Sequence, residues 1–140
     1  MHASIRISIG LLLIALCAAC AHRAPTSVDT TWNAAAAMKS LSGGWVVDLR
    51  GSPADSPYTQ PFVVASVDTD GRTITGKFYG SDITWSRINT AWGKVVVTFI
   101  TSDGLGEYTH AATLEGDTLV GTSTAKHRNL LVPWTAKRVP

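Results

Sequence analysis

From Gly43 onward, apolar and polar residues alternate in short runs that are separated by turns containing glycine. Alternation with a period of two is typical of strands that bury one face, and tight turns between such runs predict hairpins. Residues 45–50 and 130–139 each predict one strand. Three further segments each predict a pair of strands around a turn: 61–80, 83–104 and 107–125. The pattern therefore predicts eight strands.

The stretch before these strands has a different character. Four consecutive alanines favour a helix. We expect a short helix within residues 31–42, over roughly Thr31 to Ser40. One of the polar residues 29–31 would cap its start, and Gly43 would end it. Such a helix is expected to cover an open end of the strand domain.

The N-terminus has the layout of an export signal. Arg6 precedes an apolar stretch, residues 7–19, which ends in small residues. A charge, an apolar core and small residues are typical of a secretory signal peptide. The stretch is shorter than the roughly 20 residues that span a bilayer. We therefore expect a signal peptide over residues 1–19 and a tether over residues 20–30, where Pro, Ser and Thr show no apolar periodicity.

The chain has two cysteines, Cys17 and Cys20, at the end of this apolar stretch. A zinc site needs about four ligands, and only His22 lies nearby. The stretch "LCAAC" resembles the lipobox of bacterial lipoproteins, in which two small residues precede the cysteine that receives diacylglycerol. Ala18 and Ala19 match the small positions and Cys20 matches the acceptor, whereas Cys17 stands where the family prefers Leu. An ordinary cleaved signal peptide is the alternative.

The lipobox resemblance implies a location. Cys20 would be acylated and would become the first residue of the mature chain, and two or three acyl chains anchor a protein stably in a membrane. The mature chain would then keep no free cysteine, which suits an oxidising compartment. Ala21 follows Cys20, and in enterobacterial lipoproteins an Asp at that position favours the inner membrane. The resemblance therefore implies a lipid-anchored protein of the bacterial cell envelope, in the outer membrane and facing the periplasm.

The connections between the predicted strands set the fold class. They leave no room for a crossover helix, so neighbouring strands should be antiparallel. A meander of this length removes its exposed edges by closing, with the first strand pairing with the last. We therefore expect an all-β domain over residues 43–140, an eight-stranded antiparallel up-and-down barrel preceded by the short helix. A two-sheet sandwich is the alternative.

Two strands of this predicted barrel carry a recognisable pair. The first strand opens with Gly43-x-Trp45, and the last strand contains Arg138. This arrangement resembles the calycin group: lipocalins, fatty-acid-binding proteins and avidins. In that group a tryptophan of the first strand packs beneath an arginine of the last strand near the closed end of the barrel, and a guanidinium stacks well on an indole. The resemblance implies a lipocalin-like or avidin-like barrel, nearer to avidin in length.

Charge and composition exclude several functions. Lysine and arginine exceed aspartate and glutamate by only two, to a net charge of +2, and no basic run occurs. We therefore expect no nucleic-acid partner. The acidic residues fall mainly at turns, as Asp70 and Asp117 do, where turn chemistry explains them. The sequence has no nucleophile motif, phosphate loop or metal-ligand set. We expect no enzymatic activity, no cofactor and no metal.

An eight-stranded barrel is either filled by side chains or holds one small ligand. Small residues on the predicted inner face, among them Gly76, Ala112 and Gly121, would leave volume for a pocket. They could equally be small partners for large core residues. The same face carries the tentative ligand contacts: Phe78, Phe99, Tyr108, His110 and Ser123.

Polar and aromatic residues leave further alternatives open. Tyr108 and His110 share a strand face, and with Arg87 or Ser123 opposite they could fix the polar end of a ligand. Otherwise His110 faces solvent or makes one hydrogen bond in the wall. Trp85 and Trp92 are expected on opposite faces of one strand. The "KHR" turn at residues 126–128 is expected to be solvated.

The sequence thus predicts an envelope lipoprotein whose barrel binds a small apolar ligand or a lipid at its mouth. The alternative is a ligand-free structural or protein-interaction module of the bacterial envelope, which would use the outer face of its strands.

Overall fold

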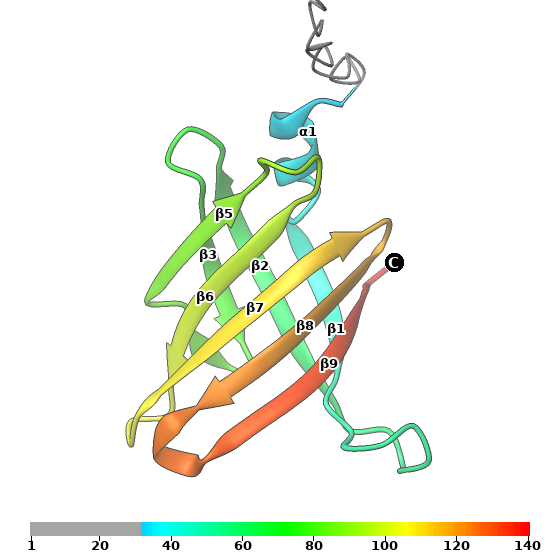
Figure 1. The fold of residues 1–140 in the computed structure, drawn as a ribbon, viewed down its shortest axis with the longest axis vertical. Helices are drawn as coiled ribbons and strands as arrows, with labels where there is room; N and C mark the ends of the chain where they lie inside the picture. Colours follow the sequence, from blue (N-terminus) through cyan, green and yellow to red (C-terminus); the bar gives the residue numbers. More distant parts are fainter. Residues whose placement is uncertain (1–31) are drawn as a thin grey trace, which may run out of the picture. The chain divides into compact units, whose positions relative to one another are not determined.

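The computed structural model describes residues 32–140, which form one short helix and one antiparallel sheet of nine strands (Figure 1). The expectations for residues 1–31, including the signal peptide, the tether and Cys20, lie outside the described residues. Within residues 32–140, no helix combines the length and the apolar character that crossing a membrane requires.

The strands account for most of the described chain, so the all-β prediction is confirmed at that level. Helix α1 spans Ala34–Lys39, and Lys126–Arg128 form a single 3₁₀ turn. The strands are β1 Gly43–Asp48, β2 Thr59–Asp68, β3 Thr73–Phe78, β4 Ser81–Asp82, β5 Trp85–Asn89, β6 Val96–Ser102, β7 Glu107–Glu115, β8 Thr118–Ala125 and β9 Leu130–Arg138. The eight expected strands correspond to β1–β3 and β5–β9, and the two-residue β4 is additional.

The hydrogen-bonded order of the sheet is β4-β3-β2-β1-β9-β8-β7-β6-β5. Strands adjacent in sequence pair throughout, except that β4 does not pair with β5. The first strand pairs with the last, and Trp45 lies opposite Arg138 in that register. The sheet therefore curls into a half-barrel, and its free edges are β4 and β5 rather than the terminal strands (Figure 1). The predicted closed ladder of eight strands is not what the described sheet forms.

The opening between β3 and β5 is bridged by other contacts. The Ser86 hydroxyl of β5 accepts a hydrogen bond from the Ile74 amide of β3 at 2.8 Å and donates one to the Ile74 carbonyl at 2.7 Å. The Ile88 amide donates to the Arg72 carbonyl at 2.8 Å. One serine thus satisfies both backbone groups of Ile74 that a paired strand would otherwise satisfy.

A β-bulge curves the sheet on the β3 side of this opening. The pairing of β2 with β3 shifts register between Val64 and Ser66. Gly76 faces this shift with a φ of +147°, and a Cβ there would lie 1.9 Å from the Val63 carbonyl oxygen. Only glycine fits such a close backbone approach. Bulges bend a strand and increase its twist, so this one bends β2 where it pairs with β3.

The inner face of the sheet forms the core. Burial alternates along β1, β6 and β8, and it confirms the inner phase predicted for β6 and β8. Three phenylalanines pack at its centre: the ring centroids of Phe62 and Phe99 lie 5.0 Å apart, and that of Phe78 lies 5.4 Å from Phe62 and 5.3 Å from Phe99. Each fully buried ring of this size contributes about 1.5–3 kcal/mol.

Helix α1 covers one end of the half-barrel (Figure 1). It is shorter than expected, because Asn33 caps its start and Ser40 its end. The Asn33 side chain accepts a hydrogen bond from the Ala36 amide at 3.0 Å. The expected cap within residues 29–31 is therefore wrong, and so is the expected end at Gly43, which instead begins β1 with a φ of +114°. Met38 is buried against the sheet and anchors the helix.

Below α1, Trp45 and Arg138 form a stacked pair. The Arg138 guanidinium carbon lies 4.2 Å from the centroid of the Trp45 ring. The Trp45 indole donates to the Leu41 carbonyl at 2.9 Å, and Arg138 donates to the carbonyls of Ser40 and Ser42. Both side chains therefore join the terminal strands to the segment that follows the helix.

Candidate ligand-binding site

The end of the half-barrel away from α1 contains a cavity of about 470 Å³. Four connections converge there: β1–β2, β3–β4, β6–β7 and β8–β9 (Figure 1). The volume falls within the range of small-molecule sites. The residues that line the cavity are Leu49, Tyr58, Phe78, Tyr79, Ser81, Thr101, Asp103, Tyr108, His110, Ser123, Arg128, Leu130 and Val132.

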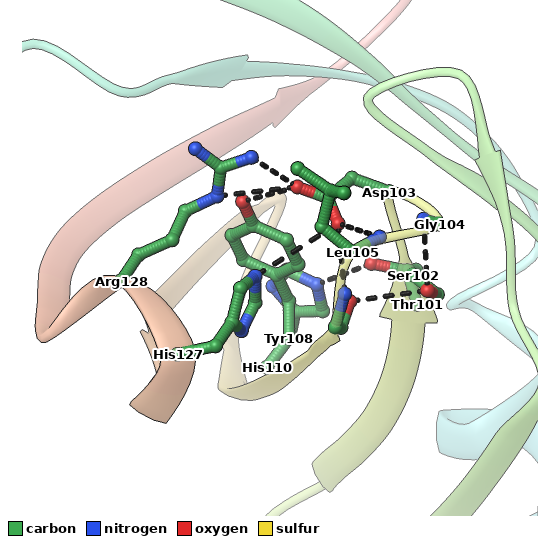
Figure 2. Close-up of polar contacts among 10 residues, drawn as sticks. Thr101, Ser102, Asp103, Gly104, Leu105, Tyr108, His110, His127 and Arg128 are labelled. Atoms are coloured by element: carbon green, nitrogen blue, oxygen red, sulfur yellow. Dashed lines mark hydrogen bonds and ion pairs between the residues drawn. The ribbon is translucent and has the colours of Figure 1, made fainter.

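A buried polar cluster forms the floor. His110 of β7 is only 2% exposed. Its Nε2 atom lies 2.9 Å from the Thr101 hydroxyl of β6, and its Nδ1 atom lies 2.7 Å from the Ser123 hydroxyl of β8 (Figure 2 shows the contact with Thr101). The Trp134 indole of β9 donates to the same Ser123 oxygen at 2.8 Å. The cluster therefore links four adjacent strands through side chains.

Burial determines the charge of His110. The pKa of His110 is lowered from 6.5 to about 4, because burial disfavours the imidazolium form. The rings of Phe78 and Phe99 lie 4.3 and 4.7 Å from the imidazole, between ring centroids, and carry no charge. His110 is therefore neutral at pH 7, with one nitrogen donating and the other accepting.

Aromatic rings continue from this floor to the mouth of the cavity. The Tyr108 ring is nearly parallel to the imidazole of His110, with an angle of 8° and a centroid distance of 6.4 Å. The imidazole in turn stacks on Phe99 at 24°. A flat apolar molecule could lie along this row of rings, because offset-stacked rings attract one another.

Asp103 organises one side of the mouth. One carboxylate oxygen accepts from the amides of Leu105 and Gly106, at 2.9 and 3.1 Å, which fixes the β6–β7 turn (Figure 2). The other accepts from the Tyr108 hydroxyl at 3.0 Å and from the Arg128 guanidinium. Arg128 and these further donors hold the pKa of Asp103 well below its ordinary value. The acid and the base at the mouth therefore neutralise each other.

Two tyrosines form the other side of the mouth. The hydroxyls of Tyr58 and Tyr79 are hydrogen-bonded, and their rings meet edge to face at 6.3 Å between centroids. The hydrogen bond to Tyr58 raises the pKa of Tyr79. Tyr79 lies in the turn after β3 with a φ of +53°, a conformation that is uncommon outside glycine. Both rings are about half exposed, so they remain accessible to a ligand.

The structure brings most of the tentative ligand contacts together. Phe78, Tyr108, His110 and Ser123 line the cavity. Phe99 does not line it but packs beneath His110.

The structure also decides between alternatives that the sequence left open. Of Arg87 and Ser123, Ser123 contacts His110, whereas Arg87 is exposed and donates to the Gly71 carbonyl at 3.0 Å. Gly121 opens no space in the cavity and is a small partner for a large core residue, because the Trp134 ring lies against it. The expectation that Trp85 and Trp92 share a strand was wrong: Trp85 begins β5, and Trp92 lies in the turn after it, 90% exposed.

Sequence reasoning missed the residues that the turns contribute. The two tyrosines opposite Asp103 were not singled out, nor was Thr101, and Arg128 was expected to be solvated. The Arg128 side chain is 47% exposed, and it also reaches Asp103 across the mouth. The turn "SDGLG" that carries Asp103 was a usable signal, since Asp often accepts hydrogen bonds from the amides of its own turn.

Neither metal ligands nor similar proteins indicate a function for this cavity. In the described part of the chain, His, Cys, Asp and Glu form no group of three or more that could hold a metal ion. Comparison of the chain with protein-family models, curated proteins and solved structures finds no match. The function is therefore argued from the cavity itself.

Proposed function

We propose that this protein binds a small, mostly apolar molecule in the cavity, as a lipid-anchored protein of the bacterial cell envelope. The observation that carries the proposal is the cavity of about 470 Å³ with apolar and aromatic walls and one buried polar cluster. Small-molecule sites combine a mostly apolar lining with a few placed polar groups that fix orientation. Of the cavity-lining residues, only Asp103 and Arg128 carry a charge at neutral pH, and they are paired.

A binding cavity of this kind needs walls on every side, including the side where β3 and β5 are not paired. We propose that the half-barrel acts as a closed cup, with the seam between β3 and β5 held shut. The double hydrogen bond of Ser86 to Ile74 and the bond from Ile88 to Arg72 hold the part of the seam nearer α1. Nearer the cavity, the Ile83 amide donates to the Gly76 carbonyl of β3 and the Thr84 amide donates to the Ile100 carbonyl of β6, and these bonds support the proposal as well. Closure of this kind is what the calycin resemblance implies.

The cavity can be tested by filling it. Val132 of β9 lines the cavity, and its neighbour Leu131 points outward and is 68% exposed. We expect the full chain to take up the neutral probe N-phenylnaphthylamine saturably, with a rise in probe fluorescence. Val132→Phe should weaken this binding about tenfold or more, since overpacking typically costs ~1–3 kcal/mol. Leu131→Phe should leave the binding unchanged.

The matched pair separates the cavity from other apolar surfaces. Probe that enters the apolar N-terminal stretch would respond equally in all three proteins, because that stretch is the same in each. Circular dichroism of both variants shows whether the sheet is intact. Equal saturable binding by wild type and a folded Val132→Phe variant would rule out the cavity as the site.

One observation favours a structural or protein-interaction role instead. Several of the outward rows that cross β6 to β9 contain no charged residue, as the strand registers show. Two of these rows are Val96, Thr113, Val120 and Thr135, and Thr98, Ala111, Thr122 and Pro133. Uncharged surfaces of this kind often mark interaction sites. A module that acted only through this face would show no saturable uptake of the probe.

The anchor has its own test. We expect Cys20→Ser to abolish labelling by radioactive palmitate and to prevent acyl anchoring, because Cys20 is the proposed acceptor. Cys17→Ser is the matched control, three residues away in the same stretch, and should keep the label. A label that persists in Cys20→Ser and is lost in Cys17→Ser would assign acylation to the other cysteine. If wild type takes up no label, Cys20 is not acylated, and an ordinary cleaved signal peptide is the remaining alternative.

A further inference from the structure

We propose that the floor of the cavity recognises a hydrogen-bond acceptor on an uncharged ligand, such as the carbonyl oxygen of a ketone or an ester. The proposal rests on the proposed function, because it names the chemical class of the ligand that the same cavity takes. It follows from the hydrogens and acceptors in the cluster of Thr101, His110, Ser123 and Trp134.

The cluster has one more hydrogen than it can use. The Trp134 indole, the two hydroxyls and the neutral imidazole each carry one hydrogen that can be donated, four in all. Only three contacts join these groups: Trp134 to Ser123, Ser123 to His110, and His110 to Thr101. One hydrogen must therefore remain without an acceptor inside the cluster.

Chemistry fixes which groups can carry the spare hydrogen. The Trp134 indole can only donate, so its hydrogen goes to Ser123. If Ser123 then donates to Nδ1 of His110, the Nε2 hydrogen goes to Thr101, and the Thr101 hydroxyl hydrogen is spare. If Nδ1 donates to Ser123 instead, Thr101 donates to Nε2, and the Ser123 hydroxyl hydrogen is spare. In both tautomers, the spare hydrogen belongs to a hydroxyl that lines the cavity.

The spare hydroxyl hydrogen makes the floor selective for one kind of ligand. Thr101 and Ser123 are 4% and 5% exposed, and among residues 32–140 neither hydroxyl has a further hydrogen-bond partner. A buried donor without an acceptor is unfavourable. A ligand oxygen at the floor removes that penalty, whereas a hydrocarbon end leaves it in place. The floor therefore favours ligands that end in an acceptor.

The charges around the cavity disfavour an anionic acceptor. His110 is neutral, and the Arg128 guanidinium is already paired with Asp103. A carboxylate at the floor would lose its hydration without meeting a free cation among the described lining residues. A neutral carbonyl gains the hydrogen bond without this penalty.

Three ligands of similar size test this inference on the full chain: benzylacetone, a ketone; butylbenzene, a hydrocarbon; and hydrocinnamate, a carboxylate. Each displaces N-phenylnaphthylamine at pH 7, and each dissociation constant is compared with the partition of that ligand between water and hexadecane. The cavity supplies a hydrogen bond that hexadecane lacks. We therefore expect the affinity of benzylacetone, relative to that of butylbenzene, to be roughly tenfold higher than the hexadecane partition of the two ligands predicts. Hydrocinnamate should bind at least about tenfold more weakly than benzylacetone.

A spectroscopic measurement locates the donor. The infrared stretching frequency of an isotope-labelled carbonyl in bound benzylacetone should be lower than the frequency in hexane. An alcohol solvent lowers this frequency in the same way, because its hydroxyl donates a hydrogen bond to the carbonyl. Tyr79→Phe removes a hydroxyl at the mouth, and it should keep the frequency shift, because the proposed donor lies at the floor. Loss of the frequency shift in Tyr79→Phe would place the donor at the mouth and overturn the proposal.

The other outcomes are distinguishable. Affinities that follow the hexadecane partition, or tightest binding by hydrocinnamate, would overturn this inference and leave the cavity as a binding site. A failure of all three ligands to displace the probe, together with equal probe uptake by wild type and Val132→Phe, would remove the proposed function as well.

Discussion

Trp45→Ala is expected to lower the free energy of unfolding by about 3–5 kcal/mol, the range for truncating a large buried aromatic residue. Trp45 is 1% exposed and lies between the sheet core and Arg138. Its removal leaves a cavity and also removes the hydrogen bond to Leu41. Urea unfolding followed by far-ultraviolet circular dichroism measures the loss without relying on tryptophan fluorescence.

The same residue tests the pairing of the terminal strands. Because Arg138 stacks on Trp45, the effects of Trp45→Ala and Arg138→Ala should not add, and the coupling should be about 0.5–2 kcal/mol. Arg87→Ala is the matched control, since Arg87 is an arginine on the distant edge strand β5. Its effect should add to that of Trp45→Ala. Additive effects of Trp45→Ala and Arg138→Ala would contradict the stacked arrangement in solution.

The fold was predictable where one periodicity persisted along a strand. Alternation over residues such as Val95, Val97 and Phe99 shows which side chains face inward, because successive residues of a strand point to opposite faces. The free edges were not predictable. They depend on the turn after Phe78, where Tyr79 and Gly80 both have positive φ, and on a two-residue strand too short to show any alternation.

The candidate site was predictable on the strands and not on the turns. Tyr108 and His110 were found because they share a face of β7. Asp103 and Arg128 are 25 residues apart, and they meet only because the β6–β7 and β8–β9 connections lie at the same end of the sheet. Alternation along a strand says nothing about which turns converge. Similarly, the spare hydrogen at the floor emerges only when the partners of Ser123 are known.

Acidification is expected to destabilise the protein through His110. Its pKa is about 4 in the folded protein and 6.5 when unperturbed, so the unfolded chain binds more protons between these values. The stabilisation from a neutral His110 is therefore fully present above about pH 6.5 and is lost as the pH falls toward 4. A difference of this size corresponds to about 3 kcal/mol, at 1.36 kcal/mol for each pKa unit.

A comparison with variants isolates this contribution from the carboxylates, which titrate in the same range. His110→Gln cannot take up a proton, so the stability of wild type minus that of His110→Gln should fall by about 3 kcal/mol between pH 7 and pH 4. A pH-independent difference would mean that folded His110 accepts a proton as readily as the unfolded chain does. The floor would then be open to water, which could take the spare hydroxyl hydrogen and remove the basis for selecting a carbonyl ligand.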